Sequence, residues 1–240
     1  MPSEPVWLNQ VHGVRVIDAA LSSCLESADA SFTNRKQVVC VTMTADCLPV
    51  LLCDQAGTAV AAIHAGWRSL CDGVIEATVA AMPVKAGQIM AWLGPAIGPD
   101  AFEVGSEVRA QFMAQDMQAE SAFKAKGDKW LGDLYAIARQ RLQTLGVTQV
   151  YGGGRCTYSE PETFFSFRRD CDTGRMGTFI CILECFGLAF STTNTPLAAP
   201  LTHDVIGPPL METLRRLSGS EDSALLNALA AAFKQHYDTT

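Results

Sequence analysis

The chain has 240 residues, of which 48% are hydrophobic and 18% charged, and its formal net charge is −7. Such a chain can bury one large core, and an acidic balance without a basic patch argues against nucleic acid as the main partner. The nine cysteines form no CxxC pair, and neither a secretory leader nor a bilayer-length apolar run is recognised. We therefore expect a cytoplasmic protein with reduced thiols and no membrane contact.

The chain begins with short predicted strands. Residues 6–11 and 14–17 are largely apolar and are separated by His12-Gly13, where glycine allows the backbone to turn. His12 can point off the end of a strand there, although a histidine in this setting is more often a residue that binds nothing. Residues 22–34 are polar and predict a loop, and the valine-rich residues 37–42 predict a buried strand.

A β-hairpin is predicted between Cys47 and His64. Residues 50–53 and 58–63 are apolar strands, and Asp54-Gln-Ala-Gly between them supplies turn residues. The register centred on that turn places Cys47 directly opposite His64, unless a bulge in the turn shifts the pairing by one. Opposed side chains have Cβ atoms about 4.5–5.5 Å apart, close enough for a thiolate and an imidazole to share a metal ion. The alternative for the cysteine is a small buried hydrophobe.

Polar residues flank both ends of this hairpin. Asp46 either orients a ligand or a proton, or caps the turn. Ser69 is expected to be the N-cap of a helix that Pro83 ends. Arg68 lies at that strand-to-helix junction, where it either helps to hold a phosphate or forms a surface salt bridge.

The second half of the chain alternates strands and helices. Residues 88–94 and 149–152 predict buried strands, residues 124–129 predict a charged loop, and Asp133 is expected to cap a helix that stops at Gly146.

An aromatic stretch and two arginines follow. Residues 163–167 predict a strand that leads to Arg168 and Arg169, which either bind a phosphate or carboxylate or pair with Asp170. Residues 175–183 predict the last strand. From residue 184 the composition changes, so residues 184–240 are expected to form a linker at 191–209 and helical pieces at 210–217 and 224–237.

Several motifs over residues 5–183 closely resemble the YfiH-like family, also called the laccase-domain or polyphenol oxidase family. They are Gln10-Val-His-Gly, Asp29-Ala-Ser, Thr44-Ala-Asp-Cys-Leu-Pro, His64-Ala-Gly-Trp-Arg, Gly94-Pro-Ala-Ile-Gly-Pro, Phe102-Glu-Val-Gly, Asp133-Leu, Cys156-Thr-Tyr, Phe165-Ser-Phe-Arg-Arg-Asp and Thr173-Gly-Arg-Met. The resemblance implies an α+β fold, a layered α/β/β/α sandwich with mixed sheets shared with cytotoxic necrotizing factor. It divides the chain into a metal-binding catalytic domain, residues 1–183, and a tail of unknown role, residues 184–240.

The resemblance also implies the site and its chemistry. It places three metal ligands at His12, Cys47 and His64, and it implies phosphorolysis of adenosine, inosine and methylthioadenosine together with adenosine deamination. Oxidation of phenols with copper is the activity otherwise attributed to the family. Typical members carry a longer N-terminal segment, so we expect part of the substrate pocket to be missing or replaced here.

Two histidines and a cysteinate leave a fourth position open, as in catalytic zinc sites, whose bound water reaches a pKa of about 7. The same ligand set also suits a copper ion, but four histidines in the whole chain exclude a trinuclear copper cluster. A metal-free hydrolase with Cys47 as nucleophile and His64 as base is the third alternative, and a binding protein is the non-enzyme alternative.

We expect the remaining site residues to handle small substrates, namely a purine nucleoside with phosphate, or phenols. Asp46 and Arg68 are assigned to catalysis beside Cys47 and His64. The residues assigned to substrate binding are Gln10, Phe165, Arg168 and Arg169. Phenylalanines near the loops can stack on a purine, although core packing is more probable for each one. A monomer or a homodimer is expected.

Overall fold

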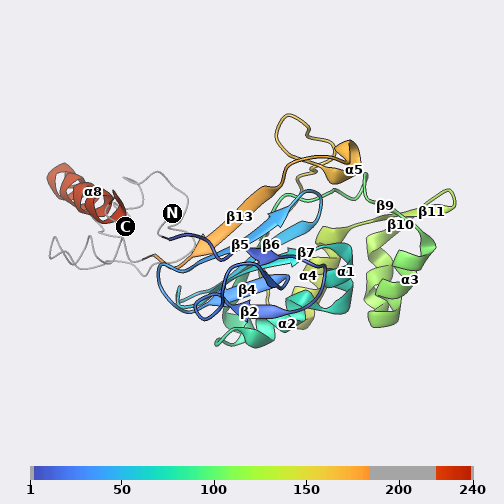
Figure 1. Ribbon diagram of the computed structural model, residues 1–240, viewed down its shortest axis with the longest axis horizontal. Coiled ribbons are helices and arrows are strands. Elements are labelled where there is room, and N and C mark those ends of the chain that lie inside the picture. Colours follow the sequence, from blue (N-terminus) through green and yellow to red (C-terminus); the bar gives the residue numbers. More distant parts are fainter. Residues whose placement is uncertain (1–2, 184–219, 239–240) are drawn as a thin grey trace.

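The computed structural model describes residues 3–183 and 220–238, and its centre is a mixed six-stranded sheet (Figure 1). Its outer pairs, β12–β8 and β4–β2, are parallel, and the remaining pairs are antiparallel. In spatial order the strands are β12 (Gln149–Gly152), β8 (Ile89–Leu93), β6 (Leu48–Asp54), β7 (Val60–Ala65), β4 (Ala30–Thr33) and β2 (Val16–Asp18).

Strand β7 is the centre of the core. Each of its six residues, Val-Ala-Ala-Ile-His-Ala, is buried, because α2 (Val74–Ala81) packs against it and so does a second sheet of β5 (Val39–Thr44) and β13 (Met176–Cys181). A strand covered on both faces needs a continuous apolar run rather than alternation. His64 is the one titratable residue in that run, so it lies on a strand whose six residues are all buried.

Smaller elements surround these layers. A three-stranded antiparallel sheet lies beside α3, and β1 pairs with β3 in parallel. The remaining elements are β1 (Leu8–Asn9), β3 (Glu26–Ser27), α1 (Trp67–Asp72), a 3-10 turn (Ala86–Gln88), β9 (Glu103–Val104), α3 (Ser106–Gln115), a 3-10 helix (Met117–Ala122), β10 (Phe123–Lys126), β11 (Lys129–Gly132), α4 (Leu134–Thr144), α5 (Phe167–Asp170) and α8 (Ser223–Asp238).

The predicted α+β class with layered, mixed sheets is confirmed, as are the strands at 37–42, 88–94 and 149–152 within a residue or two at each end. The predicted Asp133 cap is present, since its carboxylate accepts a hydrogen bond from the Ala136 amide at 2.9 Å.

Two segments predicted as loops are strands. Residues 22–34 contain β3 and β4, and Ser31 and Thr33 of β4 are buried rather than solvated because β4 lies between β7 and β2 in the central sheet. Residues 124–129 form the β10–β11 hairpin, in which Lys126 and Lys129 both pair with Glu103 of β9. A charge cluster here marks cross-strand ion pairing, not a loop.

The hairpin register is also corrected. His64 pairs with Pro49 and Val60 with Cys53, so the pairing is shifted by two residues from the prediction. The Asp54 carboxylate accepts amide hydrogen bonds from Thr58 at 2.6 Å and from the next residue at 2.7 Å, which lengthens the turn. The predicted site cysteine therefore lies in the bend before β6 instead of opposite His64.

Two helix starts differ from the predictions. Residues 163–167 form no strand, because Ser166 caps α5 by accepting a hydrogen bond from the Arg169 amide at 3.2 Å. Ser69 is not an N-cap, since α1 begins at Trp67. Its hydroxyl instead donates to backbone carbonyls at the end of β7, among them that of His64 at 2.9 Å.

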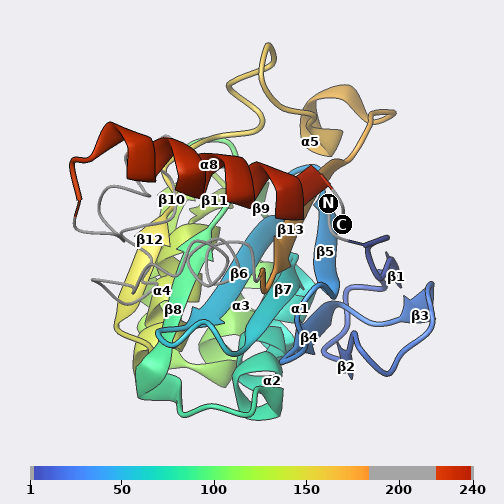
Figure 2. The ribbon, with the colours of Figure 1, turned by 90° about the vertical axis from the view of Figure 1, so that its left-hand side faces the viewer.

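The predicted C-terminal helix is present as α8, which Figure 1 shows at the left, apart from the sheets, and Figure 2 shows from that side. The expected linker at 191–209 and helix at 210–217 lie outside the described residues. The division of the chain at residues 183 and 184 therefore stays a prediction. Within the described ranges, no helix combines the length and apolarity that a membrane span requires.

Candidate metal centre

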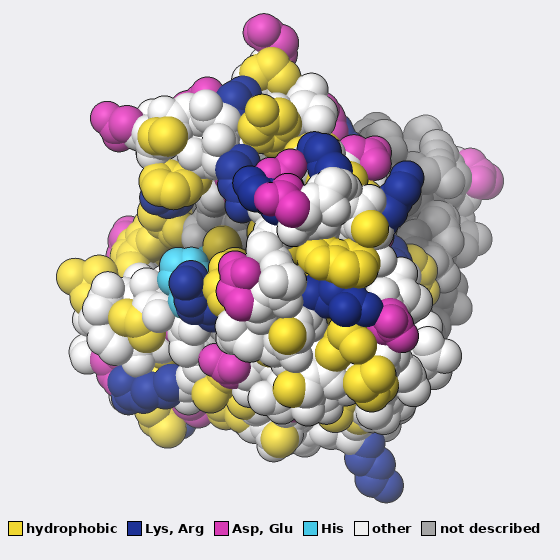
Figure 3. All heavy atoms as spheres, turned by 90° about the vertical axis from the view of Figure 1, so that its right-hand side faces the viewer, with side chains coloured by type: hydrophobic (Ala, Val, Ile, Leu, Met, Phe, Trp, Pro, Cys, Tyr) yellow, Lys and Arg dark blue, Asp and Glu magenta, His cyan; other side chains and the backbone are white. Residues whose placement is uncertain are grey.

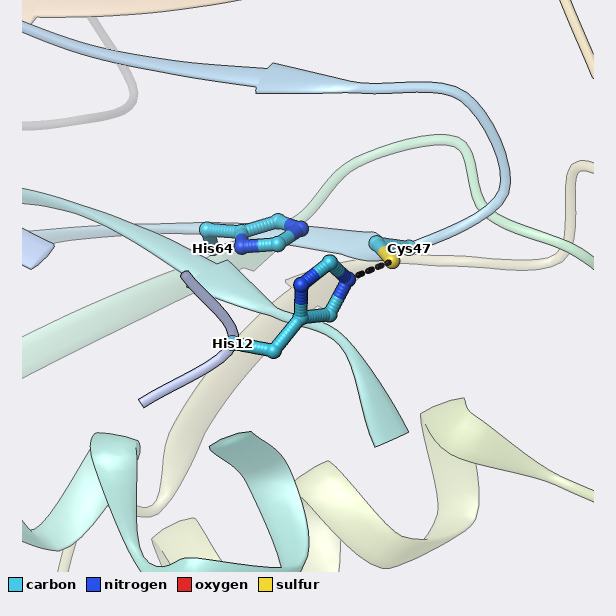
Figure 4. Close-up of side chains that lie close together, drawn as sticks. All are labelled: His12, Cys47 and His64. Carbon is cyan, nitrogen blue, oxygen red and sulfur yellow. Dashed lines mark hydrogen bonds between the residues drawn. The ribbon is translucent and has the colours of Figure 1, made fainter. Parts of the chain in front are cut away.

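Three side chains from separate elements converge at one end of the β6–β7 hairpin (Figure 4). His12 lies in the loop between β1 and β2, Cys47 in the bend before β6, and His64 on β7. One ligand atom from each lies within 4.8 Å of the others, and the Cys47 Sγ is 3.7 Å from the His12 Nε2. The imidazole rings meet edge to face at 4.7 Å between centroids.

A fully buried carboxylate lies behind the two histidines. Asp29, just before β4, accepts the side-chain hydrogen bond of His64 Nδ1 at 2.7 Å. It also accepts the amide hydrogens of Val11 at 3.2 Å, His12 at 2.9 Å and Gly13 at 2.6 Å. Burial alone would raise the pKa of Asp29, but the hydrogen bonds from His64 and the backbone lower it, so the carboxylate is ionised at neutral pH.

The surroundings of the site favour the thiolate form of Cys47 and the protonated form of the His64 imidazole. Burial would raise the pKa of Cys47, but hydrogen bonds and positive charge from His12 and His64 lower it to about 7. Burial would lower the pKa of His64, but hydrogen bonds with Asp29 and Cys47 raise it to about 9. The thiolate needed for metal ligation is therefore accessible near neutral pH.

The site is tightly closed on one side and open on the other. A Cβ added at Gly66 would lie 2.8 Å from the His12 Cδ2 and 3.0 Å from the Cys47 Sγ, so only glycine fits at this junction. The His12 side chain is exposed while His64 is buried. Figure 3 shows histidine at the surface beside a basic side chain, at the edge of a hollow with hydrophobic atoms.

Asp46 and Gln10 are close to the ligands in sequence but are engaged in holding the backbone. The Asp46 carboxylate, at a residue with φ of 90°, accepts hydrogen bonds from the Thr157 hydroxyl and the Arg168 amide, both at 2.6 Å. The Gln10 side chain donates to the Met43 carbonyl at 2.8 Å and accepts from the Met43 amide at 2.7 Å. Asp46 thus ties the Cys47 bend to α5, and Gln10 ties the loop before His12 to β5.

The three arginines assigned to phosphate differ in their existing contacts. Arg169 is engaged with Asp170 and with the carbonyls of residues 157, 158 and 164. Arg168 donates to the Glu103 carbonyl at 2.8 Å. Arg68 is exposed and lies over the Trp67 ring, 4.3 Å from its centroid, and within the described residues its guanidinium makes no hydrogen bond or ion pair.

Phe165, the fourth residue assigned to substrate, is 50% exposed in the segment before α5. Its ring lies against Gly174, where an added Cβ would approach within 2.8 Å. The structure therefore groups His12, Cys47 and His64 directly, and it attaches the α5 segment to them through Asp46.

Asp29 and Gly66 are the site residues that the sequence reasoning did not assign. Both stand inside motifs quoted for the family resemblance, Asp29-Ala-Ser and His64-Ala-Gly-Trp-Arg. An acidic residue flanked by two alanines, and a glycine two residues after His64, were the signals available in the sequence.

Residues 1–183 match the family described as "Multi-copper polyphenol oxidoreductase laccase". The chain belongs to this family.

Its relatives carry a more specific name. The chain is 58% identical over 184 residues to "Purine nucleoside phosphorylase YfiH" of Shigella flexneri, and the match covers 76% of each chain. It is 51% identical over 183 residues to "Purine nucleoside phosphorylase" of Haemophilus influenzae, covering 75% of each. Among solved structures, a Neisseria meningitidis protein of the DUF152 family matches at 51% identity and a TM-score of 0.72, covering 75% of each chain. The Bacillus licheniformis protein YfiH matches at 29% identity and a TM-score of 0.67, covering 74% of this chain and 73% of that one.

The donor set fits a transition metal. Tetrahedral zinc with bonds of about 2.0–2.3 Å requires ligand atoms roughly 3.3–3.7 Å apart, and the sulfur–nitrogen distance of 3.7 Å already meets this. Because Asp29 engages the Nδ1 of His64, the Nε2 of that ring is the atom free to ligate. The three residues would hold the ion, and the exposed side at His12 would leave a further position open to water or substrate.

Proposed function

We propose that the chain is a zinc-dependent enzyme of purine nucleosides that carries out phosphorolysis and adenosine deamination. The observation that carries the proposal is the convergence of His12, Cys47 and His64 with one open side. The name of the relatives at 51–58% identity supports the substrate class. Bound zinc would supply a Lewis acid and an acidified water.

The two reactions differ in the bond that breaks. In phosphorolysis a phosphate oxygen bonds to the sugar carbon C1′, and the purine leaves with the electron pair of the glycosidic bond and takes up a proton. In deamination water adds at the purine C6, and ammonia leaves. Adenosine plus phosphate therefore gives adenine and ribose 1-phosphate, whereas adenosine plus water gives inosine and ammonia.

The test is product analysis with a protein of defined metal content. Zinc-loaded protein incubated with adenosine and phosphate is expected to yield adenine and ribose 1-phosphate, and without phosphate only inosine and ammonia. Inosine and methylthioadenosine are expected to be cleaved when phosphate is present. Zinc-loaded protein that leaves all three nucleosides intact, with its metal verified by mass spectrometry, would contradict the proposal.

Arg68 is proposed to hold the phosphate, because it is exposed two residues beyond Gly66 and its guanidinium is unpaired in the described part of the chain. Arg68→Ala is expected to raise the phosphate KM roughly 10- to 100-fold, the loss of a charged hydrogen bond. Arg68→Lys should recover part of this loss. Zinc content and deamination should be unchanged in both variants.

The matched control is Lys85→Ala, which also removes one exposed positive charge, before the 3-10 turn that follows α2. Its phosphate KM should equal that of the unsubstituted chain. An Arg68→Ala variant with the same KM as this control would remove Arg68 from the phosphate site.

Copper-dependent oxidation of phenols is the second candidate. The family description and the chemistry of a His₂Cys set favour it. Phenol turnover by the copper-loaded protein, with nucleosides untouched by the zinc form, would replace our proposal.

A metal-free hydrolase is the third candidate. The order Cys47, His64 and Asp29 resembles the arrangement of a nucleophile, a base and an orienting acid. Turnover that persists after complete metal removal would favour this candidate over zinc.

A further inference from the structure

We infer that Asp29 is the positioning residue of the metal centre: one carboxylate sets which nitrogen of His64 faces the metal and holds the loop that presents His12. The inference deepens the proposed function and rests on it, because it concerns the same metal site. It assigns a role to a residue that touches neither metal nor substrate.

The first step concerns His64. An ionised carboxylate can only accept hydrogen bonds, so the 2.7 Å contact from Nδ1 to Asp29 requires the ring proton on Nδ1. In the neutral ring that ligates a metal, the lone pair is then on Nε2, the atom on the Cys47 side of the ring (Figure 4). A buried ring with no such partner could adopt the other tautomer, which would direct a proton at the metal. Carboxylate–histidine pairs of this kind fix ligand orientation in metal sites.

The second step concerns His12. Its backbone has a φ of 59°, a left-handed conformation that non-glycine residues rarely adopt. Three successive amides, from Val11 to Gly13, donate to the same carboxylate at 2.6–3.2 Å. These bonds offset the backbone strain and place the exposed His12 side chain above the site.

The third step is that both tasks fall on the Asp29 side chain, and each of its two carboxylate oxygens already accepts two hydrogen bonds. Oδ1 accepts from His64 and from the His12 amide, and Oδ2 accepts from Val11 and Gly13. Replacing either oxygen by an NH₂ group places a donor against two donors. Asp29→Asn therefore disturbs the ligand geometry from either amide orientation, although its volume is nearly unchanged.

The closing experiment compares Asp29→Asn with Asp54→Asn. Asp54 is 5% exposed and its carboxylate also accepts two backbone amides, but at the opposite end of the same hairpin. Both variants are expected to melt at a lower temperature than the unsubstituted chain. Only Asp29→Asn should lose zinc affinity, by roughly 10- to 100-fold in a competition assay with a chromophoric chelator.

Two results would overturn the inference. One is equal zinc affinity for Asp29→Asn and the unsubstituted chain. The other needs no variant: nitrogen-15 NMR of the zinc-loaded protein is expected to show His64 protonated at Nδ1 and ligating through Nε2, and ligation through Nδ1 would contradict it.

These outcomes are separable from the proposed function. An unsubstituted chain that binds zinc but leaves nucleosides intact would overturn the proposed function and leave the role of Asp29 standing. Equal zinc affinity in Asp29→Asn and in the unsubstituted chain would overturn the role of Asp29 and leave the proposed function standing. A chain that binds no zinc would overturn both.

Discussion

Cys47→Ala is expected to abolish tight zinc binding and reduce nucleoside phosphorolysis to background. The substitution removes the only sulfur among the three converging ligand atoms and leaves two imidazoles. Loss of a partner outside the ligand shell already costs roughly 10- to 100-fold in affinity, so loss of a ligand should cost more. Competition titration with a chromophoric chelator and adenine release under saturating phosphate measure the two effects.

The control for this variant is Cys53→Ala on the same strand. Cys53 is partly buried in β6 and pairs with Val60 at the far end of the hairpin. It should retain full zinc affinity and activity, which separates ligand loss from the loss of a sulfur in the core. If Cys47→Ala lost its metal yet turned over adenosine normally, the proposed mechanism would fail.

The core strands were predictable because their signals are local. The run from Val60 to Ile63 is apolar throughout, and it forms most of β7, a strand buried on both faces. Asp133 precedes an amphipathic stretch and caps α4. Such signals need no knowledge of the rest of the chain.

The register and the α5 segment were not predictable in this way, because residues far away in sequence decide them. Asp46 accepts the amide of Arg168, 122 residues away, which helps to hold the aromatic stretch as a turn and short helix instead of a strand. Asp29 was assigned to a loop because residues 22–34 were interpreted as a polar stretch, yet its partners are His64 and three amides of another segment.

The convergence of the ligands illustrates both cases. Cys47 and His64 were brought together in the prediction by a hairpin register that is shifted by two residues in the structure. They still meet, because the bend at Asp46, with its φ of 90°, turns Cys47 back towards the end of β7. Only the family resemblance, not periodicity, connected His12 with them.

Gly66→Ala is expected to leave a folded protein with a disrupted metal site. The added Cβ would lie 2.8 Å from the His12 Cδ2 and 3.0 Å from the Cys47 Sγ, both shorter than van der Waals contact. His12 is exposed in its loop while Cys47 is held in the bend before β6, so the imidazole is the group that moves away. Zinc affinity should fall by more than about tenfold, since a ligand is displaced, while the melting temperature of the metal-free protein changes little.

The backbone at Gly66 supports a purely steric effect, because its φ of −62° and ψ of 160° are open to alanine. The matched control is Gly87→Ala, where an added Cβ meets nothing within 4 Å; its zinc affinity should equal that of the unsubstituted chain. Zinc affinity retained in Gly66→Ala would show that His12 can yield without leaving the metal. A large fall in the melting temperature of its metal-free form would instead show that the α1 junction, rather than His12, absorbs the clash. Zinc titration and thermal melting of the metal-free proteins therefore separate the two accounts.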